Sequence, residues 1–84
     1  MLKQRSGQIA IHVLQGYSCP QVARVFGVSP QWANDCVCHC CRKVAHDVWE
    51  NAQYAKGSQL AFLRKHKFTL ISLIKHNLEQ YGGV

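Results

Sequence analysis

The amino-acid sequence predicts an all-α fold of four helices. Three observations predict this class: apolar residues recur three and four positions apart, serine stands where helices would begin, and glycine follows each of the first three apolar patterns. The chain has 84 residues, of which 48% are hydrophobic, and this is enough for one domain with a modest core. We therefore expect residues 1–84 to form a single domain.

The first helix is predicted from residue 6 or 7 to about residue 15. Ile9, Val13 and Leu14 give it an inward apolar face, and Gly16 follows as its C-terminal stop. The preceding residues 1–5 are expected to form a short basic arm that can touch phosphate.

The second helix is predicted over residues 18–26 from its two ends. Ser18 can cap it, and Pro20 lies in the first turn, where a missing N–H costs little. Gly27 then stands where the helix must stop and where a positive φ is most easily tolerated.

The third helix is predicted to begin with Ser29 as its cap and Pro30 at its first position. No breaker follows before Gly57, so we expect one continuous helix over about residues 30–55. Its inward side follows three- and four-residue spacing. The residues on that side are Ala33, Cys36, Val37, Cys40, Cys41, Val44, Val48 and Ala52.

The last helix is predicted over residues 58–81, with Gly57 as the break before it and Ser58 as its cap. Its apolar residues cover more than one face, and a monomer seldom exposes such a patch. We therefore expect a homodimer built on the outer side of this helix. The expected interface residues are Phe68, Ile71, Leu73 and Leu78.

The first half of the chain resembles region four of bacterial sigma factors and the related output domains of response regulators. The matching residues are Leu14, Gly16, Tyr17, Ser18, Val22, Ala23, Phe26, Gly27, Val28, Ser29, Arg42, Lys43 and Val44. The resemblance covers roughly residues 5–46 and implies a helix-turn-helix core over 6–46. In that motif the second helix enters the major groove of double-stranded DNA.

A small DNA-binding transcriptional regulator is therefore the leading hypothesis, and the formal net charge of +6 favours a polyanionic partner. The amides of Gln31 and Asn34 suit adenine, the carboxylate of Asp35 can accept from cytosine, and the helix start at Ser29 suits a phosphate. The candidate DNA-binding residues are Arg24, Ser29, Gln31, Trp32, Asn34, Asp35, Cys38, His39, Arg42 and Lys43.

The start of the third helix departs from the sigma-factor pattern. Where those proteins carry several basic residues, this chain has Pro30, Trp32, Asn34 and Asp35. Trp32 is either an aromatic packed at the rim of the core or an exposed anchor for a thymine methyl or a protein. The second hypothesis is therefore a protein-interaction module that binds RNA polymerase, a sigma factor or another regulator instead of DNA.

Four of the five cysteines fall between residues 36 and 41, in one predicted helix. Cys36, Cys40 and Cys41 fit the inward side as small apolar residues. The alternative is a zinc site, but one helix cannot direct four ligands to one point, so Cys19, His12 or His46 would have to complete it. We expect reduced thiols and no metal or other cofactor.

Catalytic and membrane functions have little support in the sequence. Only four carboxylates occur, none of them paired at a useful spacing, and no glycine-rich phosphate loop is present. We therefore expect a protein that is not an enzyme. No apolar run reaches membrane-spanning length and no signal-peptide core follows the N-terminus, so we expect a cytoplasmic protein without a membrane partner.

Overall fold

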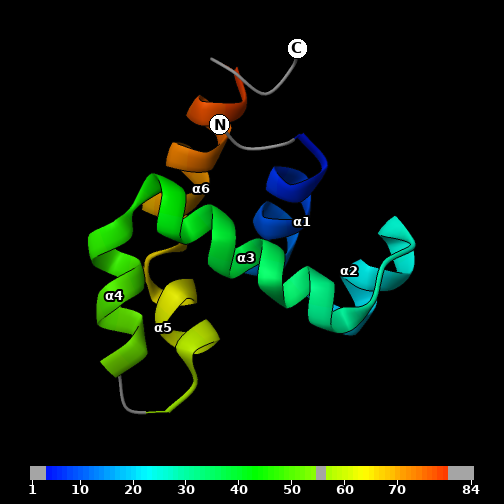
Figure 1. Cartoon of the computed structure of the whole chain (residues 1–84), viewed down its shortest axis with the longest axis horizontal. Coiled ribbons are helices and arrows are strands. Elements are labelled where there is room, and N and C mark those ends of the chain that lie inside the picture. Colours follow the sequence, from blue (N-terminus) through cyan, green and yellow to red (C-terminus); the bar gives the residue numbers. More distant parts are fainter. Residues whose placement is uncertain (1–3, 55–56, 80–84) are drawn as a thin grey trace.

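The computed structural model describes residues 4–54 and 57–79, which form six α-helices (Figure 1). The helices are α1 (Gln4–Leu14), α2 (Cys19–Phe26), α3 (Pro30–Val44), α4 (His46–Tyr54), α5 (Gln59–Lys65) and α6 (Lys67–Asn77). The described residues contain no strand, so the all-α class is confirmed. None of these helices is both long and apolar enough to cross a membrane.

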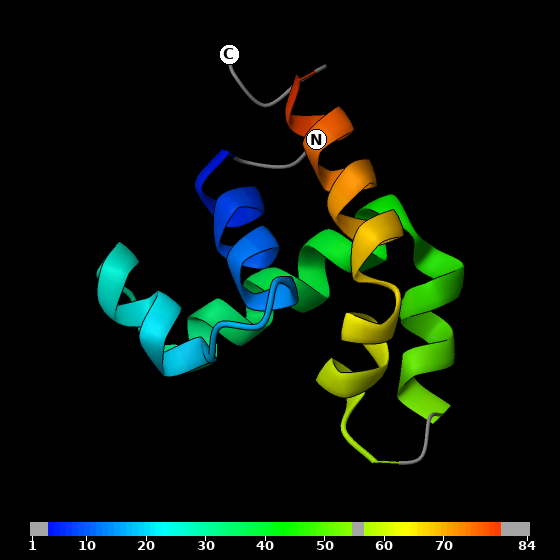
Figure 2. The same cartoon turned by 180° about the vertical axis from the view of Figure 1, so that it is seen from behind.

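Helix α3 is the element around which the others are arranged. It contacts α1, α2, α4 and α6. It lies in front of α1 and α6 in Figure 1, and these two helices lie in front of it in the reverse view of Figure 2. Helices α1 and α6 therefore cover one side of α3, while α2 packs near its start and α4 follows its end.

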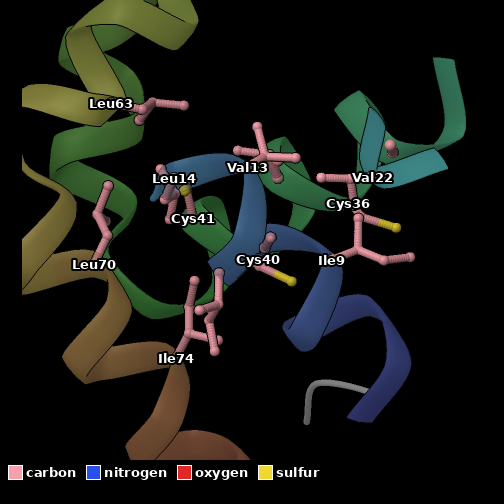
Figure 3. Close-up of a cluster of buried hydrophobic side chains, with 14 of the residues drawn as sticks. Ile9, Val13, Leu14, Val22, Cys36, Cys40, Cys41, Leu63, Leu70 and Ile74 are labelled. Atoms are coloured by element: carbon pink, nitrogen blue, oxygen red, sulfur yellow. The ribbon is translucent and has the colours of Figure 1, made fainter. Parts of the chain in front are cut away.

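The inward side predicted for the third helix is confirmed over α3. Its five buried residues are at most 5% exposed and belong to the same cluster as buried side chains of α1, α2 and α6. They are Ala33, Cys36, Val37, Cys40 and Cys41. Figure 3 shows the sulfur atoms of the cysteines within this cluster, among apolar side chains from other helices. The cysteines therefore act as small core residues.

The prediction of one helix over residues 30–55 is wrong, because the helix is interrupted at Ala45 (φ −150°, ψ 69°). The Ala45 N–H still donates to the Cys41 carbonyl, and the Ala45 carbonyl accepts from Trp49, at 2.9 and 3.0 Å. Neither Gly nor Pro stands here, so tertiary packing explains the bend. It turns α4 so that it packs against α5 and buries Ala52. Residue 55 lies outside the described residues.

The prediction of one helix over residues 58–81 is also wrong. Ser58 does cap α5, because its Oγ accepts from the Ala61 N–H at 3.4 Å. The helix is then interrupted at His66 (φ −106°, ψ 21°), whose N–H donates to the Leu63 carbonyl. The interruption lets α5 pack on α4 while α6 packs on α1 and α3. Residues 80–81 lie outside the described residues.

The predicted dimer face does not form one surface. Leu78 is 6% exposed and packs against α1, where a Cβ built on Gly7 would lie 2.7 Å from Leu78 Cδ1. Phe68 and Leu73 are 81% and 37% exposed, but five helical positions turn them about 140° apart around α6. Ile71 is half-buried beside Phe68. The four residues therefore divide between the core and two sides of α6, and the homodimer itself stays a prediction.

The first helix begins earlier than predicted, at Gln4, so the end of the expected arm is helical. Residues 1–3 lie outside the described residues. The helix ends at Leu14 and is followed by Gly16, which has a φ of 120° and acts as the predicted stop.

Arg64 ties α5 to the end of α1. Its Nε donates to the Val13 carbonyl at 3.2 Å, and its Nη2 donates to the Tyr17 carbonyl at 3.0 Å. The last carbonyls of a helix have no partner within the helix, so a cation that reaches Val13 stabilises this terminus. The half-buried side chain of Arg64 therefore stabilises the fold, whereas its neighbour Lys65 is exposed.

We predict that Arg64→Ala lowers the free energy of unfolding by about 2 kcal/mol, because it removes the two charge-assisted hydrogen bonds that join α5 to the end of α1. Lys65→Ala is the matched control, because it removes one positive charge from the adjacent residue. It should change the free energy of unfolding by less than about 0.5 kcal/mol. Urea denaturation followed by circular dichroism measures both. Equal effects of the two variants would contradict the assigned role.

The buried thiols predict a loss of stability at alkaline pH. Burial raises the pKa of Cys40 and of Cys41 from 9.0 to about 12. In the unfolded chain these thiols ionise above about pH 9, whereas in the folded chain they stay protonated. The free energy of unfolding should therefore fall as the pH rises from 9 to 12, by up to about 1.4 kcal/mol per pH unit for each thiol.

The control for this prediction is the double variant Cys40→Ala/Cys41→Ala. Its absolute stability should be lower because it leaves small cavities, but its dependence on pH above 9 should be shallower than that of the natural chain. Urea denaturation at a series of pH values gives both curves. Parallel curves would show that other groups cause the alkaline loss.

Candidate nucleic-acid interface

The turn between α2 and α3 is fixed by capping at both ends of α2. The Ser18 Oγ accepts from the Gln21 N–H at 3.2 Å, while the Gln21 side chain accepts from the Ser18 N–H at 3.0 Å. Gly27 adopts the left-handed conformation (φ 70°), and the N–H groups of Gly27 and Val28 both donate to the Ala23 carbonyl. The predicted cap and the predicted stop of this helix are both confirmed.

Helix α3 begins as predicted. The Ser29 Oγ accepts from the Trp32 N–H at 3.1 Å, and Pro30 occupies the first helical position. Val22 and Ala23 of α2 are buried, as is Ala33 of α3, and the two helices pack on each other. Small residues on both helices allow this close packing, which fixes the direction in which α3 presents its exposed residues.

Four exposed side chains lie along the side of α3 that the other helices leave open. They are Gln31, Asp35, His39 and Arg42, spaced four, four and three residues apart, and we call them the outward face of α3. The Gln31 Nε2 donates to the Asp35 Oδ1 at 3.1 Å. The first two polar groups of this face therefore hold each other in place.

Trp32 and Arg5 lie on one side of the outward face. Trp32 is 39% exposed, and the Cζ of Arg5 lies 5.9 Å from the centroid of its ring. The Arg5 side chain also donates a hydrogen bond to the Phe26 carbonyl at the end of α2. Trp32 is thus an exposed aromatic beside the start of α3, with the Arg5 guanidinium over its ring. Lys43 lies about three turns further along the same side.

Sequence reasoning missed the role of Arg5 because it placed this residue in an arm. One signal could have found it: Arg5 precedes the core residue Ile9 by four positions, so a helix that began earlier would direct both to one side. Arg5 in fact joins α1 to the end of α2 and to the start of α3.

Asn34 and Cys38 lie on the other side of α3 and face α5. Both are half-buried and line a small cleft of about 140 Å³ together with Ser58, Gln59 and Leu60. Asn34 is therefore less accessible than Gln31, and the prediction that Asn34 and Cys38 are exposed is wrong. The position of α5, which the sequence did not reveal, is the reason.

Three exposed cations, one on α2 and two in the last turn of α3, have no carboxylate partner among the described residues. Among residues 4–54 and 57–79, no carboxylate lies within ion-pair distance of Arg24, Arg42 or Lys43, all of which are exposed. The Cζ of Arg42 lies 5.6 Å from the centroid of the Trp49 ring, which orients its side chain at the far end of the face. Three of the predicted basic residues are therefore free to meet phosphate.

Trp49 of α4 lies near Cys38 of α3. The Trp49 Nε1–H is buried and has no hydrogen-bond partner among the described residues. Burial raises the pKa of the Cys38 thiol, and the nearby indole of Trp49 opposes the rise without completing a hydrogen bond of ordinary geometry. The environment of Cys38 therefore favours the protonated thiol over the thiolate.

The described residues bring no three His, Cys, Asp or Glu side chains together as ligands for a metal ion. The sequence had left His12 open as a further ligand. Its Nδ1 lies 2.7 Å from the Gln8 carbonyl, so this nitrogen donates to the backbone of α1. The ring lies 5.7 Å from the ring of Phe26, centroid to centroid, and this contact links α1 with α2.

Comparisons of this chain with protein-family models, with curated proteins and with solved structures found no match. What the chain offers a partner is therefore defined by its own surface. That surface combines an open polar side of α3, a capped helix start at Ser29 and three cations that form no ion pair with the described residues.

Proposed function

We propose that this protein is a small DNA-binding transcriptional regulator in which α2 and α3 act as a helix-turn-helix. The observation that carries the proposal is the outward face of α3, which no other described helix covers and which begins at the first turn after the cap. A helix presented in this way fits the width of the DNA major groove. The formal net charge of +6 supports a polyanionic partner.

The side chains around this face divide into two roles. Gln31 and Asp35 are close to the start of α3, where base edges are reached, and the Asp35 carboxylate suits the amino group of cytosine. Arg24, Arg42 and Lys43 suit phosphates, which fix the position of the helix without reading sequence. Asp35 also repels phosphate, so base reading would come at some cost in general affinity.

A second candidate function is a protein-interaction module that binds RNA polymerase, a sigma factor or another regulator. The exposed apolar surface of α1 and α2 favours it. Val25 and Tyr17 are 80% and 53% exposed, and they border a cleft of about 400 Å³ that is also lined by His12 and Phe26. Aromatic and aliphatic groups around a hollow are typical anchors for a protein partner.

The DNA proposal predicts a steep dependence of binding on salt. Each neutralised phosphate contributes about −0.9 to the slope of log affinity against log salt, so a few contacts give a slope of about −3 to −5. The double variant Arg42→Ala/Lys43→Ala should make the slope shallower by about 2 and weaken binding to all sequences alike. Fluorescence anisotropy with a labelled random-sequence duplex measures this.

The matched control is Lys65→Ala, an exposed lysine of α5 that is remote from the outward face. It should leave the slope unchanged. Binding that ignores salt, or no binding by the natural chain, would contradict the proposal. In that case Val25→Ser, together with capture of purified RNA polymerase, would test the second candidate function.

Substitution of Asp35 is expected to raise the affinity for random-sequence DNA and to lower the discrimination between sequences. Asp35→Asn removes a negative charge from the outward face and should strengthen binding to a random-sequence duplex, by up to about 1 kcal/mol. If the carboxylate binds the amino group of cytosine, the same variant should lose about 1–3 kcal/mol of discrimination. Discrimination here is the difference in binding free energy between a duplex that the natural chain selects from a random pool and the random-sequence duplex. Anisotropy titrations with both duplexes give the two numbers.

Glu79→Gln is the control, because it removes the same charge from an exposed residue beyond the end of α6. It should change neither number. If Asp35→Asn instead lowers the affinity for both duplexes, the negative charge of Asp35 does not weaken DNA binding. The hydrogen bond from Gln31 to Asp35 would then be the more important role of this side chain.

A further inference from the structure

A groove of about 470 Å³ runs along the outer side of α6, next to the end of α1. It is lined by Gln15, Lys67, Phe68, Ile71, Ser72 and Lys75, and we call it the α6 groove. Phe68 is 81% exposed and Ile71 is half-buried beside it. An aromatic ring this exposed offers apolar surface that the described residues leave largely uncovered.

Two lysines frame this apolar surface. Lys67 and Lys75 are eight residues apart, which places them about 12 Å apart along α6. The Nζ of Lys67 lies 5.3 Å from the centroid of the Phe68 ring, so charge and apolar surface are adjacent. No carboxylate of the described residues lines the groove. Glu79, one turn beyond Lys75, lines a neighbouring cleft together with Gln4, Gln8 and Lys75 itself, but no ion pair between Lys75 and Glu79 forms within 4.0 Å.

The charges of the α6 groove decide which occupant it suits. A second copy of this chain would bring another Lys67 and Lys75 against the first pair, and neither lysine has an ion-pair partner among the described residues that could offset this repulsion. Nucleic acid would satisfy the charges but would leave Phe68 and Ile71 without an apolar partner. An acidic segment with an apolar anchor satisfies both requirements.

We propose that the α6 groove binds an acidic amphipathic helix of a partner protein. An apolar side chain of that helix packs on Phe68 and Ile71, and carboxylates near its two ends pair with Lys67 and Lys75. The two lysines are spaced by two turns of α6, so carboxylates two turns apart on a partner helix match them.

This site goes beyond the proposed binding of DNA and does not depend on it. Helix α6 packs on the covered side of α3, through Leu70 and Ile74, whereas the outward face points away from this contact (Figures 1 and 2). The chain can therefore hold a protein partner on α6 while α3 stays open.

The test uses a labelled peptide designed as an amphipathic helix, with leucine and phenylalanine on one side and glutamate on the other. Fluorescence anisotropy with the full chain, without DNA, should show saturable binding. Lys67→Glu and Lys75→Glu should each weaken it roughly tenfold, and Phe68→Ser should weaken it roughly thirtyfold. Circular dichroism confirms folding, and Lys67→Gln replaces Lys67→Glu if that variant unfolds.

Two matched controls isolate the groove. Lys65→Glu makes the same charge change outside it, and Tyr54→Ser removes an aromatic side chain that is 85% exposed on α4. Both should bind the peptide as the natural chain does. A peptide with lysine in place of glutamate, or with serine in place of the apolar residues, should not bind.

The proposal would be overturned by no binding of the acidic peptide, by equal loss in the control and groove variants, or by equal binding of the lysine peptide. A natural chain that sediments as a dimer, and that Phe68→Ser converts to a monomer, would also overturn it and would assign the groove to a second copy. Since no DNA is present, none of these results bears on the outward face of α3.

Discussion

The packing of α3 against four other helices is the interaction on which the rest of this structure depends. Its buried side is made of small residues, alanine, valine and cysteine, so α1 and α2 can approach it closely. Residues three and four positions apart lie on one side of a helix, and in α3 this is the side that is buried. The opposite side of α3 is therefore left exposed. The core and the outward face are two sides of one helix, and a change that rotates α3 would alter both.

Cysteine in the core has chemical consequences that alanine would not have. A thiol of this size fills space as a small apolar group. It also carries a proton that burial prevents it from losing, which is why Cys40 and Cys41 have a pKa of about 12. The cluster of cysteines that suggests a metal site in the sequence contributes three side chains to the packing of the core, at Cys36, Cys40 and Cys41.

Features that depend on neighbouring residues could be predicted from the sequence. The caps at Ser18, Ser29 and Ser58 and the stop at Gly27 each follow from a side chain or a glycine acting within one turn. The inward side of α3 also followed from spacing alone. These predictions hold because the energies involved are local.

Features that depend on distant residues could not be predicted. The interruptions at Ala45 and His66 carry no Gly or Pro and arise because α4 and α5 pack on each other. Asn34 faces α5 for the same reason, although its spacing from Gln31 suggested one surface. Arg64 joins carbonyls 47 and 51 residues away, and no pattern in the sequence links such positions.

We propose that the outward face of α3 contacts DNA while the helices behind it do not. Amide chemical shifts of the ¹⁵N-labelled chain, recorded during titration with a short duplex, test this most directly. We expect the largest changes at Gln31, Asp35, His39 and Arg42 and little change along α5 and α6. Changes confined to Tyr17 and Val25 or to α6, or no change at all, would contradict it.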